Sequence, residues 1–227
     1  PGTAQGRRPG GSVSVPPDQA SVWGIVVAGG TGARFGGPKH AMELDGKPLW
    51  VWGRDTLVDA GVNHVIVVGP VPGGIPGGNR RRDSVAAGLS EIPDDVDFIV
   101  VHDAARPLAK KELVEGIIET LMTRDVDGVV PAVPVRDTLK EVDDKDVVSR
   151  TLPRDHCVAV QTPQGFAANA LRAAHSALEG SYTDDAGMIE ENGGRVVVVP
   201  GDPRNIKVTY PEDLAVVRAL VAGEADL

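Results

Sequence analysis

Val26-Val27-Ala28-Gly29-Gly30-Thr31-Gly32-Ala33-Arg34-Phe35-Gly36-Gly37-Pro38-Lys39 is the most informative stretch of this chain. The apolar run from Val22 to Ala28 predicts a buried strand that ends in this glycine-rich loop. Glycines have no Cβ atom, so their backbone N–H groups can approach an anion closely. Arg34 and Lys39 add two positive charges to the same loop. A strand followed by such a loop predicts an α/β fold that binds a polyphosphate.

The loop differs from two common phosphate-binding patterns. It lacks the Gly-Lys-Ser/Thr ending of the Walker loop of NTPases. Gly30-x-Gly32 fits the start of a dinucleotide fingerprint, but Phe35 stands where the third glycine belongs, which disfavours a nicotinamide-dependent oxidoreductase. A glycine turn after a strand can also be a plain tight connection. The charges of Arg34 and Lys39 favour a nucleoside triphosphate.

Composition restricts the class of protein. The length of 227 residues and an apolar content rich in Val, Ala, Leu and Ile suit parallel strands covered by helices. The net charge of −9 argues against a nucleic-acid partner. We expect no membrane partner either, because no apolar stretch reaches the length of about 20 residues that a span needs. Cys157 is the only cysteine, which excludes an internal disulfide and fits a reducing, cytoplasmic compartment.

Strand-like runs alternate with helical patterns along most of the chain. Residues 1–20 are rich in Gly, Pro and Ser and are expected to be a flexible leader or an expression remnant, whereas residues 21–227 are expected to form a single domain. The alternation predicts a doubly wound, mostly parallel, Rossmann-like sheet with the ligand at the carboxyl ends of its strands. The predicted strands are Val22–Ala28, His64–Gly69, Phe98–His102, Gly128–Pro134, Cys157–Gln161, Arg195–Pro200 and Asn205–Val208. The predicted helices are Pro48–Ala60, Ser84–Ile92, Lys110–Arg124, Ala167–Leu178, Asp184–Asn192 and Pro211–Ala222.

One segment, Pro134 to Pro153, breaks this alternation. Val and Leu alternate there with charged residues around Asp143-Asp144-Lys145, which predicts a β-hairpin. The segment is too polar for a core, so we expect it to project as an arm at about residues 134–153. Such an edge is usually kept solvated or buried by a partner, and we favour a homodimer contact.

A candidate ligand site follows the predicted strand Phe98–His102. Asp103, at the carboxyl end of this strand, should face the ligand crevice, where it could bind Mg²⁺ directly or through water. Arg106 could face a phosphate; the alternative is a structural Asp–Arg pair that fixes the turn. His102 is expected to be a packed residue at the end of the strand.

A second glycine turn, Gly77-Gly78, precedes three arginines and then Asp83-Ser84. The functional interpretation places the backbone of this turn and Ser84 against the base and ribose of a nucleotide. The alternative is that Asp83 or Ser84 caps the following helix. Runs of arginine are often a solvated surface, so we assign no separate role to Arg81 or Arg82.

Two further positions are of interest. Thr183-Asp184-Asp185 reads first as an ordinary helix N-cap. Lys207 lies in the predicted strand Asn205–Val208 between apolar neighbours, and a buried ammonium requires an anion. If Lys207 points to the crevice, it is a second clamp on phosphate.

These motifs follow one another in a defined order. They are Ala28-Gly29-Gly30-x-Gly32-x-Arg34-Phe35 with Pro38-Lys39, Gly77-Gly78 with Asp83-Ser84-Val85, Val101-His102-Asp103-Ala104-Ala105-Arg106-Pro107, Pro134-Val135-x-Asp137-Thr138, Gln161-Thr162-Pro163-Gln164, Thr183-Asp184-Asp185 and Asn205-Ile206-Lys207-Val208-Thr209-x-Pro211-Glu212-Asp213-Leu214. From about Trp23 to Leu220 the chain resembles the 2-C-methyl-D-erythritol 4-phosphate cytidylyltransferase family. It departs at His40-Ala41-Met42, where relatives commonly have Gln and an aromatic residue, and at Gly165, where an aromatic or apolar residue is more usual.

The resemblance implies transfer of CMP from CTP to a phosphorylated polyol, with Mg²⁺ or another divalent cation. The catalytic residues that it implies are Arg34, Lys39 and Lys207. The CTP-binding residues that it implies are Ala28, Gly29, Gly30, Thr31, Gly32, Gly77, Gly78, Ser84, Asp103 and Ala104. The acceptor-binding residues that it implies are Asp103, Arg106, Thr138, Arg154, Thr162, Thr183 and Lys207. It also implies that the arm with Thr138 and Arg154 reaches the site of a neighbouring subunit.

Three other functions remain open at the level of sequence. A sister enzyme could use another acceptor, such as ribitol 5-phosphate, or a sugar 1-phosphate. A nucleotide-binding regulator without catalytic activity could have kept the same loop. Lys39, Asp103 and Lys207 are all present, which argues against the regulator.

Overall fold

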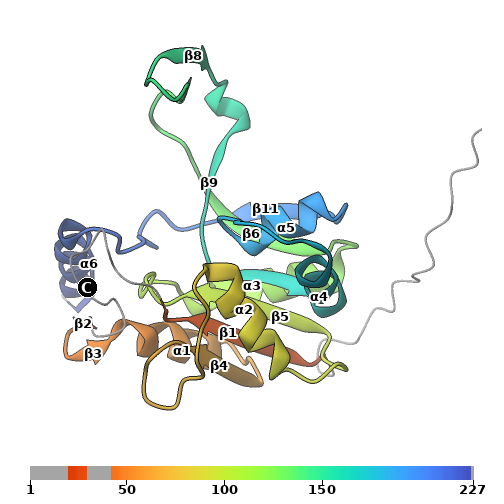
Figure 1. Cartoon of the computed structure of the whole chain (residues 1–227). Helices are drawn as coiled ribbons and strands as arrows, with labels where there is room; N and C mark the ends of the chain where they lie inside the picture. The colour runs from red at the N-terminus through yellow and green to blue at the C-terminus, as the bar shows by residue number, and fades with distance from the viewer. Residues whose placement is uncertain (1–19, 30–41, 226–227) are drawn as a thin grey trace, which may run out of the picture.

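The computed structural model describes residues 20–29 and 42–225, in which helices flank a central sheet and an arm projects from it (Figure 1). The predicted leader lies outside these residues, except for its last position. So does most of the first glycine loop, including five predicted site residues: Gly30, Thr31, Gly32, Arg34 and Lys39.

The central sheet has the strand order β11-β6-β10-β5-β1-β4, and β9 also pairs with β6. The strand bounds are β1 Val22–Val27, β4 His64–Val68, β5 Phe98–Asp103, β6 Gly128–Pro134, β9 Val158–Val160, β10 Gln164–Ala167 and β11 Val196–Pro200. β1 is parallel to both β4 and β5, and β11 is parallel to β6. The predicted mostly parallel α/β sheet is therefore confirmed, with β9 and β10 as antiparallel additions.

The register brings three strand ends to one edge of the sheet. Val27 lies opposite Val68 on one side and Asp103 on the other. The carboxyl ends of β1, β4 and β5 therefore meet there, which is where an open α/β sheet binds its ligand.

Two layers of helices cover the sheet. The bounds are α1 Leu49–Asp59, α2 Arg81–Ser90, α3 Lys111–Thr123, α4 Ala168–Ala177 and α5 Asp185–Glu191. Side chains alternate along β1, so Val26 joins one apolar cluster with Leu57 of α1 and Val114 of α3. Ile25 joins another cluster, which contains Val85 of α2 and Leu171 of α4. β1 is thus buried from both sides, as is typical of a central parallel strand.

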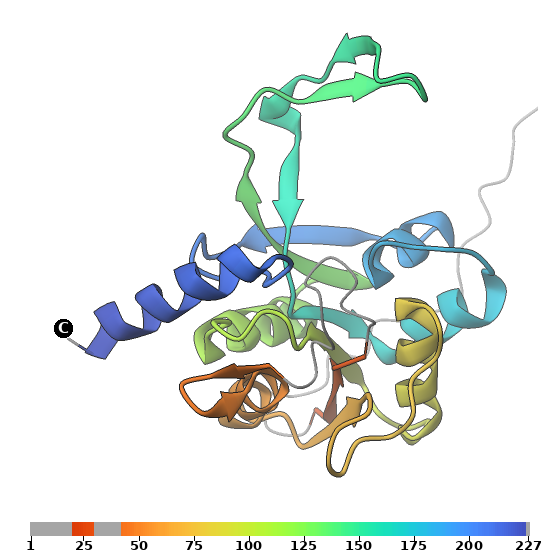
Figure 2. The same ribbon diagram turned by 60° about the vertical axis from the view of Figure 1, so that its left-hand side comes forward.

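A smaller unit lies beside this core. Helix α6, Pro211–Ala225, projects past the sheet in Figure 2. Its Val217 packs with Leu44, Leu49 and Val208 in a separate apolar cluster. Leu44 comes from a short hairpin of β2, Glu43–Leu44, and β3, Lys47–Pro48.

The arm is a hairpin, as the sequence predicts. β7, Lys140–Val142, pairs antiparallel with β8, Val148–Thr151, and the chain returns to the sheet through the 3₁₀ helix η2, Arg154–His156, and β9. Figures 1 and 2 show the arm extending away from the helices and the sheet. Its apolar side chains Val142, Val147 and Val148 are exposed.

One predicted strand is wrong, and one strand of the sheet was not predicted. Asn205–Val208 is not a strand, because its backbone is held by other groups: Val208 N–H donates to Ala105 O, and the Asn205 carbonyl accepts from Arg106 Nη1. β10 is a strand that the sequence pattern does not indicate. Its Gly165 packs against Ile117 of α3, where an added Cβ would lie only 2.4 Å from Ile117 Cγ2.

The start of α2 also differs from the prediction. The helix begins at Arg81, three residues before Ser84, with Arg80 as its N-cap residue. Asp83 accepts from the backbone N–H of Arg80, so it contributes one half of a capping box. The N-cap interpretation is confirmed for Asp184, whose Oδ1 accepts from Gly187 N–H at the start of α5. Within the described part of the chain, none of the helices has both the length and the apolar character needed to cross a membrane.

Candidate active site

Asp103, at the carboxyl end of β5, is the centre of the candidate site. Its Oδ1 accepts a hydrogen bond from Arg81 Nε at 3.0 Å, and its Oδ2 accepts one from Lys207 Nζ at 2.6 Å. Its backbone N–H donates to Thr162 Oγ1 at 3.0 Å. One buried carboxylate thus joins β5, the start of α2 and the segment that follows β11.

The surroundings of Asp103 keep it ionised. Burial alone disfavours the charged form, but the nearby Arg81 and Lys207 cations outweigh it and hold the pKa of the carboxyl well below its usual range. The Asp103 carboxylate is therefore a fixed negative charge between two positive ones at neutral pH.

Arg81 links Asp103 to a second buried carboxylate. Its Nη1 donates to Asp185 Oδ2 at 2.6 Å, and His175 Nε2 lies 2.9 Å from Asp185 Oδ1. Burial opposes ionisation of Asp185, yet Arg81 and the hydrogen bond from His175 lower the pKa of its carboxyl. The expectation that Arg81 is a solvated residue without a role is therefore wrong, because this guanidinium is buried between two carboxylates.

A cavity of 170 Å³ lies beside this cluster. Its lining residues are Arg81, Asp103, Arg106, Val160, Gln161, Thr162, Gln164, Thr183, Asp184 and Lys207. Five of the predicted acceptor-binding residues are therefore brought together from distant parts of the chain. Thr138 and Arg154 are not among the lining residues; both belong to the arm, where Arg154 Nη1 donates to Arg136 O.

Arg106 lines the cavity without pairing with Asp103. Its Nη1 donates to Asn205 O at 2.7 Å and its Nη2 to Val160 O at 3.4 Å. Burial lowers the pKa of this guanidinium from its ordinary value. The alternative of a structural Asp–Arg side-chain pair is therefore not what the turn contains; Arg106 instead fixes two backbone segments at the cavity wall.

His102 is packed inside the molecule, as the sequence suggests. Burial lowers the pKa of its ring to about 4, so the imidazole is neutral near pH 7. Nε2 lies 3.1 Å from Arg106 O, which can only accept, and Nδ1 lies 3.2 Å from Thr162 Oγ1. A neutral ring with one proton therefore donates from Nε2 and accepts the Thr162 hydroxyl at Nδ1. This arrangement orients Thr162 at the cavity.

Three of the described residues predicted to bind CTP, Gly29, Gly77 and Gly78, lie around a fourth, Ser84. Gly78 N–H donates to Ser84 Oγ at 3.2 Å, and an added Cβ on Gly77 would lie 2.7 Å from the same oxygen. An added Cβ on Gly29, at the end of β1, would lie 3.8 Å from it. Gly29 and the second glycine turn, Gly77-Gly78, therefore meet at one hydroxyl. The backbone N–H of Ala104 donates to Val27 O, so this group belongs to the junction of β1 and β5.

Direct binding of Mg²⁺ by Asp103 is opposed by its neighbours. Each carboxylate oxygen already accepts from a cationic side chain, so a metal ion on Asp103 would share the carboxylate with Arg81 and Lys207 and would lie close to their positive charges. Within residues 20–29 and 42–225, no group of three or more His, Cys, Asp and Glu side chains could hold a metal ion. The described side chains therefore supply cations for an anionic ligand and no protein cage for a metal.

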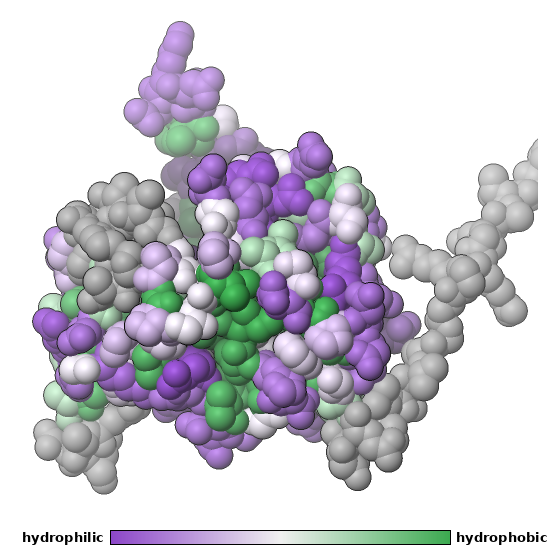
Figure 3. Space-filling view, turned by 60° about the horizontal axis from the view of Figure 1, so that its bottom comes forward, coloured by the Kyte–Doolittle hydropathy of each residue, from purple (hydrophilic) through white to green (hydrophobic). Residues whose placement is uncertain are grey.

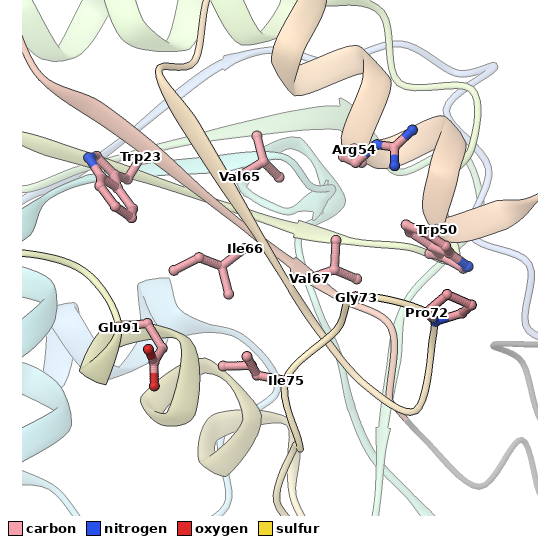
Figure 4. Close-up of a pocket in the computed structure, with 10 residues that line it drawn as sticks. All are labelled: Trp23, Trp50, Arg54, Val65, Ile66, Val67, Pro72, Gly73, Ile75 and Glu91. Atoms are coloured by element: carbon pink, nitrogen blue, oxygen red, sulfur yellow. The ribbon is translucent and has the colours of Figure 1, made fainter.

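A separate, more apolar hollow of 430 Å³ follows the edge strand β4. Figure 3 shows an apolar strip in the middle of the face that bears β4, and Figure 4 shows Trp23, Val65 and Ile66 along the hollow, with Trp50 at one end. It shares no lining residue with the Asp103 cavity. It also lacks convergent polar groups, so it does not compete with that cavity as the candidate active site.

Comparison with known proteins points to one family. The family model described as 2-C-methyl-D-erythritol 4-phosphate cytidylyltransferase matches residues 22–223. Two proteins with that name resemble the chain: one from Rhodococcus jostii (strain RHA1) is 41% identical, with 87% of this chain and 93% of that protein covered, and one from Frankia casuarinae is 42% identical, with 87% and 80% covered.

Solved structures give the same result. A 2-C-methyl-D-erythritol 4-phosphate cytidylyltransferase from Thermus thermophilus is 31% identical, with a TM-score of 0.73 and coverage of 87% of this chain and 98% of that chain. A 4-diphosphocytidyl-2C-methyl-D-erythritol synthase from Anaerococcus prevotii is 28% identical, with a TM-score of 0.75 and coverage of 89% and 99%. Sequence and fold are therefore similar over nearly the full length of these relatives.

Proposed function

The chain belongs to the 2-C-methyl-D-erythritol 4-phosphate cytidylyltransferase family, and we propose that its Asp103 cavity is where the acceptor phosphate meets CTP. The enzyme transfers CMP from CTP to 2-C-methyl-D-erythritol 4-phosphate, giving 4-diphosphocytidyl-2-C-methyl-D-erythritol and pyrophosphate in the non-mevalonate isoprenoid pathway. The observation that carries the location is the convergence of Asp103, Thr162 and Lys207 on one cavity at the carboxyl edge of the sheet.

The reaction requires little proton transfer. A phosphate oxygen of the acceptor attacks the α-phosphorus of CTP, a P–O bond forms, and the bond to the leaving pyrophosphate breaks. A phosphomonoester has a second pKa of about 6, so the nucleophile is already mostly ionised near neutral pH and no general base is needed. The neutral, hydrogen-bonded ring of His102 is consistent with this expectation. The protein has to position the reactants and stabilise negative charge.

Lys207 supplies positive charge on the acceptor side. Its ammonium is held by Asp103, yet its side chain remains 41% exposed, so it can also contact a ligand phosphate. Arg34 and Lys39 would neutralise the triphosphate and the leaving pyrophosphate. The backbone from Ala28 to Gly32 would bind the triphosphate, and Gly77, Gly78, Ser84, Asp103 and Ala104 would bind the cytosine and ribose. Arg106, Thr162 and Thr183 would surround the acceptor.

Mg²⁺ would belong to the nucleotide more than to the protein. When bound, a divalent cation supplies charge neutralisation on phosphate oxygens. The pairing of Asp103 with Arg81 and Lys207 favours a contact with the metal through water over a direct one.

The arm completes the proposal. Thr138 and Arg154 would reach the acceptor site of a second subunit in a homodimer. Support comes from the projection of the arm (Figure 1), from its exposed valines and from the fact that neither residue lines the cavity of its own chain. We place the enzyme in the cytoplasm, and its single cysteine fits that reducing compartment.

The test is pyrophosphate release in the presence of Mg²⁺, each of the four common NTPs and a panel of acceptors that includes 2-C-methyl-D-erythritol 4-phosphate and ribitol 5-phosphate. We expect release with CTP and 2-C-methyl-D-erythritol 4-phosphate only. Release with CTP and ribitol 5-phosphate instead would move the chain to a sister activity. Binding of CTP without any release would identify a nucleotide-binding regulator.

A further inference from the structure

Three consecutive arginines precede or open α2, and they differ in what they contact. Arg80 makes an exposed bidentate pair with Asp83 and also donates to Gly180 O. Arg82 donates from Nη2 to the backbone oxygen of His175. Arg81 alone among the three pairs with the buried carboxylates Asp103 and Asp185. Arg81 is thus the inward-facing arginine, and its neighbours Arg80 and Arg82 are residues of the same type that can serve as controls.

The guanidinium of Arg81 is fixed at both ends. Nε donates forward to Asp103 at 3.0 Å, and Nη1 donates backward to Asp185 at 2.6 Å. The Asp185 side chain is fully buried, and its other oxygen faces His175 Nε2. Asp185 belongs to α5 and His175 to α4, so two packed helices anchor the arginine from behind.

The contact between Arg81 and Asp103 matters because the same carboxylate also binds the Lys207 ammonium. Its Oδ1 is taken by Arg81, which leaves Oδ2 directed at Lys207 Nζ at 2.6 Å. Without Arg81, the carboxylate could rotate and bring both oxygens to Lys207. The ammonium would then be drawn away from the cavity, and more of its charge would be neutralised by Asp103.

We propose that Arg81 is a positioning residue, which fixes the Asp103 carboxylate and thereby aligns the Lys207 ammonium with the acceptor phosphate. This inference rests on the proposed function. A guanidinium suits the task because it presents separate N–H groups in a rigid plane, so it can hold two carboxylates in different directions. A lysine at this position keeps the charge but cannot hold both carboxylates in that geometry.

Steady-state pyrophosphate release tests the proposal with one substitution at three adjacent positions. Arg81→Lys should lower kcat by about tenfold to a hundredfold, since small misplacements of reacting groups have effects of that order. The KM for CTP should change less than kcat, because the displaced charge is that of Lys207 on the acceptor side, although Asp103 also belongs to the residues proposed to bind CTP. Arg80→Lys and Arg82→Lys are the matched controls and should keep a kcat close to that of the unmodified enzyme. Equal kcat values for all three variants would overturn the proposal.

A double-mutant cycle with Lys207→Ala separates positioning from a general loss of structure. If Arg81 acts through Lys207, then Arg81→Lys should change kcat by less than about twofold once Lys207 is already alanine. A merely structural role predicts the same fold-loss in both backgrounds, and that result would overturn the proposal. If Arg81→Lys does not fold, Asp185→Asn replaces it in the cycle, because it removes the rear anchor and keeps the arginine.

Failure of the proposed function and failure of the role of Arg81 give different experimental results. If the proposed function is wrong, the unmodified enzyme itself releases no pyrophosphate from CTP and 2-C-methyl-D-erythritol 4-phosphate. If only the role of Arg81 is wrong, the unmodified enzyme is active and the cycle is additive.

Discussion

Two arginine–carboxylate pairs of similar length lie in opposite environments in this molecule. Arg81 and Asp103 approach to 3.0 Å beneath the active-site cavity, with 18% and 11% of their side chains exposed. Arg150 and Glu141 approach to 2.7 Å on the arm, with 65% and 47% exposed. The shorter pair is the one that water screens.

The difference shows that distance does not decide the effect of an ion pair. An exposed pair contributes only about 0–1 kcal/mol to the free energy of unfolding. Breaking a buried pair costs about 3–5 kcal/mol, largely because one charge is left without a partner. A buried pair is nevertheless weak evidence for stability, since an apolar replacement of the whole pair is often as stable. We propose that the Arg81–Asp103 pair matters here because it sets the position of the Lys207 ammonium, which Asp103 also binds.

The largest expected effect comes from removing the rear carboxylate. Asp185→Ala leaves Arg81 and His175 buried without their shared anion, so we expect the free energy of unfolding to fall by about 3–5 kcal/mol. Urea denaturation followed by circular dichroism measures it. Asp144→Ala, at the exposed turn of the arm, is the control and should have little effect. A loss below about 1 kcal/mol for Asp185→Ala would place this buried pair in the same class as the exposed one.

The next effect concerns catalysis. Lys207→Ala removes one charged donor from the acceptor side, and we expect kcat to fall on the order of a hundredfold, or about 3 kcal/mol, by analogy with single oxyanion donors. Lys39→Ala should have a similar effect through the triphosphate. The matched control is Lys140→Ala, whose ammonium contacts only Thr151 on the arm among the hydrogen bonds of the described chain. A folded Lys207→Ala enzyme with nearly normal kcat would contradict the assigned role.

Burial of His102 should make the stability of the protein depend on pH. The pKa of His102 is lowered to about 4, below the ordinary value of 6.5, so between these values the unfolded chain binds a proton that the folded chain does not. Stability should therefore fall with acidification through this window; His102 should account for about 2 kcal/mol of the loss between about pH 7.5 and pH 5.

The substitution His102→Gln should remove the part of the pH dependence of the free energy of unfolding that His102 causes. The free energy of unfolding of both proteins is measured at about pH 7.5 and pH 5, the two ends of the window. A constant offset between them at the two pH values would show that His102 titrates alike in the folded and unfolded states. A narrowing of the offset toward the acidic end is the expected result.

The sequence predicted the strands better than it predicted the charge pairs. Runs such as Val22–Val27 and Gly128–Pro134 consist mostly of apolar residues, so their burial can be predicted from their composition. Lys207 is expected from the sequence to face an anion because a buried ammonium needs one, and it does pair with Asp103. Its side chain is nevertheless 41% exposed and its segment is not a strand, so the partner was predicted correctly from a premise of burial that the structure contradicts.

Arg81 could not be identified in the same way. Three arginines in a row carry no periodicity, so the sequence does not tell which one points inward. Arg81 points inward because α2 starts at this residue and because Asp185, which lies 104 positions further along the chain, accepts a hydrogen bond from it. Thr138 and Arg154 are a different case, because their predicted site belongs to a second subunit and the single chain does not test it.

The smallest expected effect returns to the arm. Arg150→Gln removes the exposed pair with Glu141, and we expect a change of no more than about 0.5 kcal/mol in the free energy of unfolding. Unfolding is followed at two protein concentrations, with Glu141→Gln as the reciprocal variant. A loss above about 1 kcal/mol that grows with protein concentration would mean that the pair is desolvated in solution. The arm would then be covered by a second copy, and the contrast between the two pairs would be a property of the isolated chain alone.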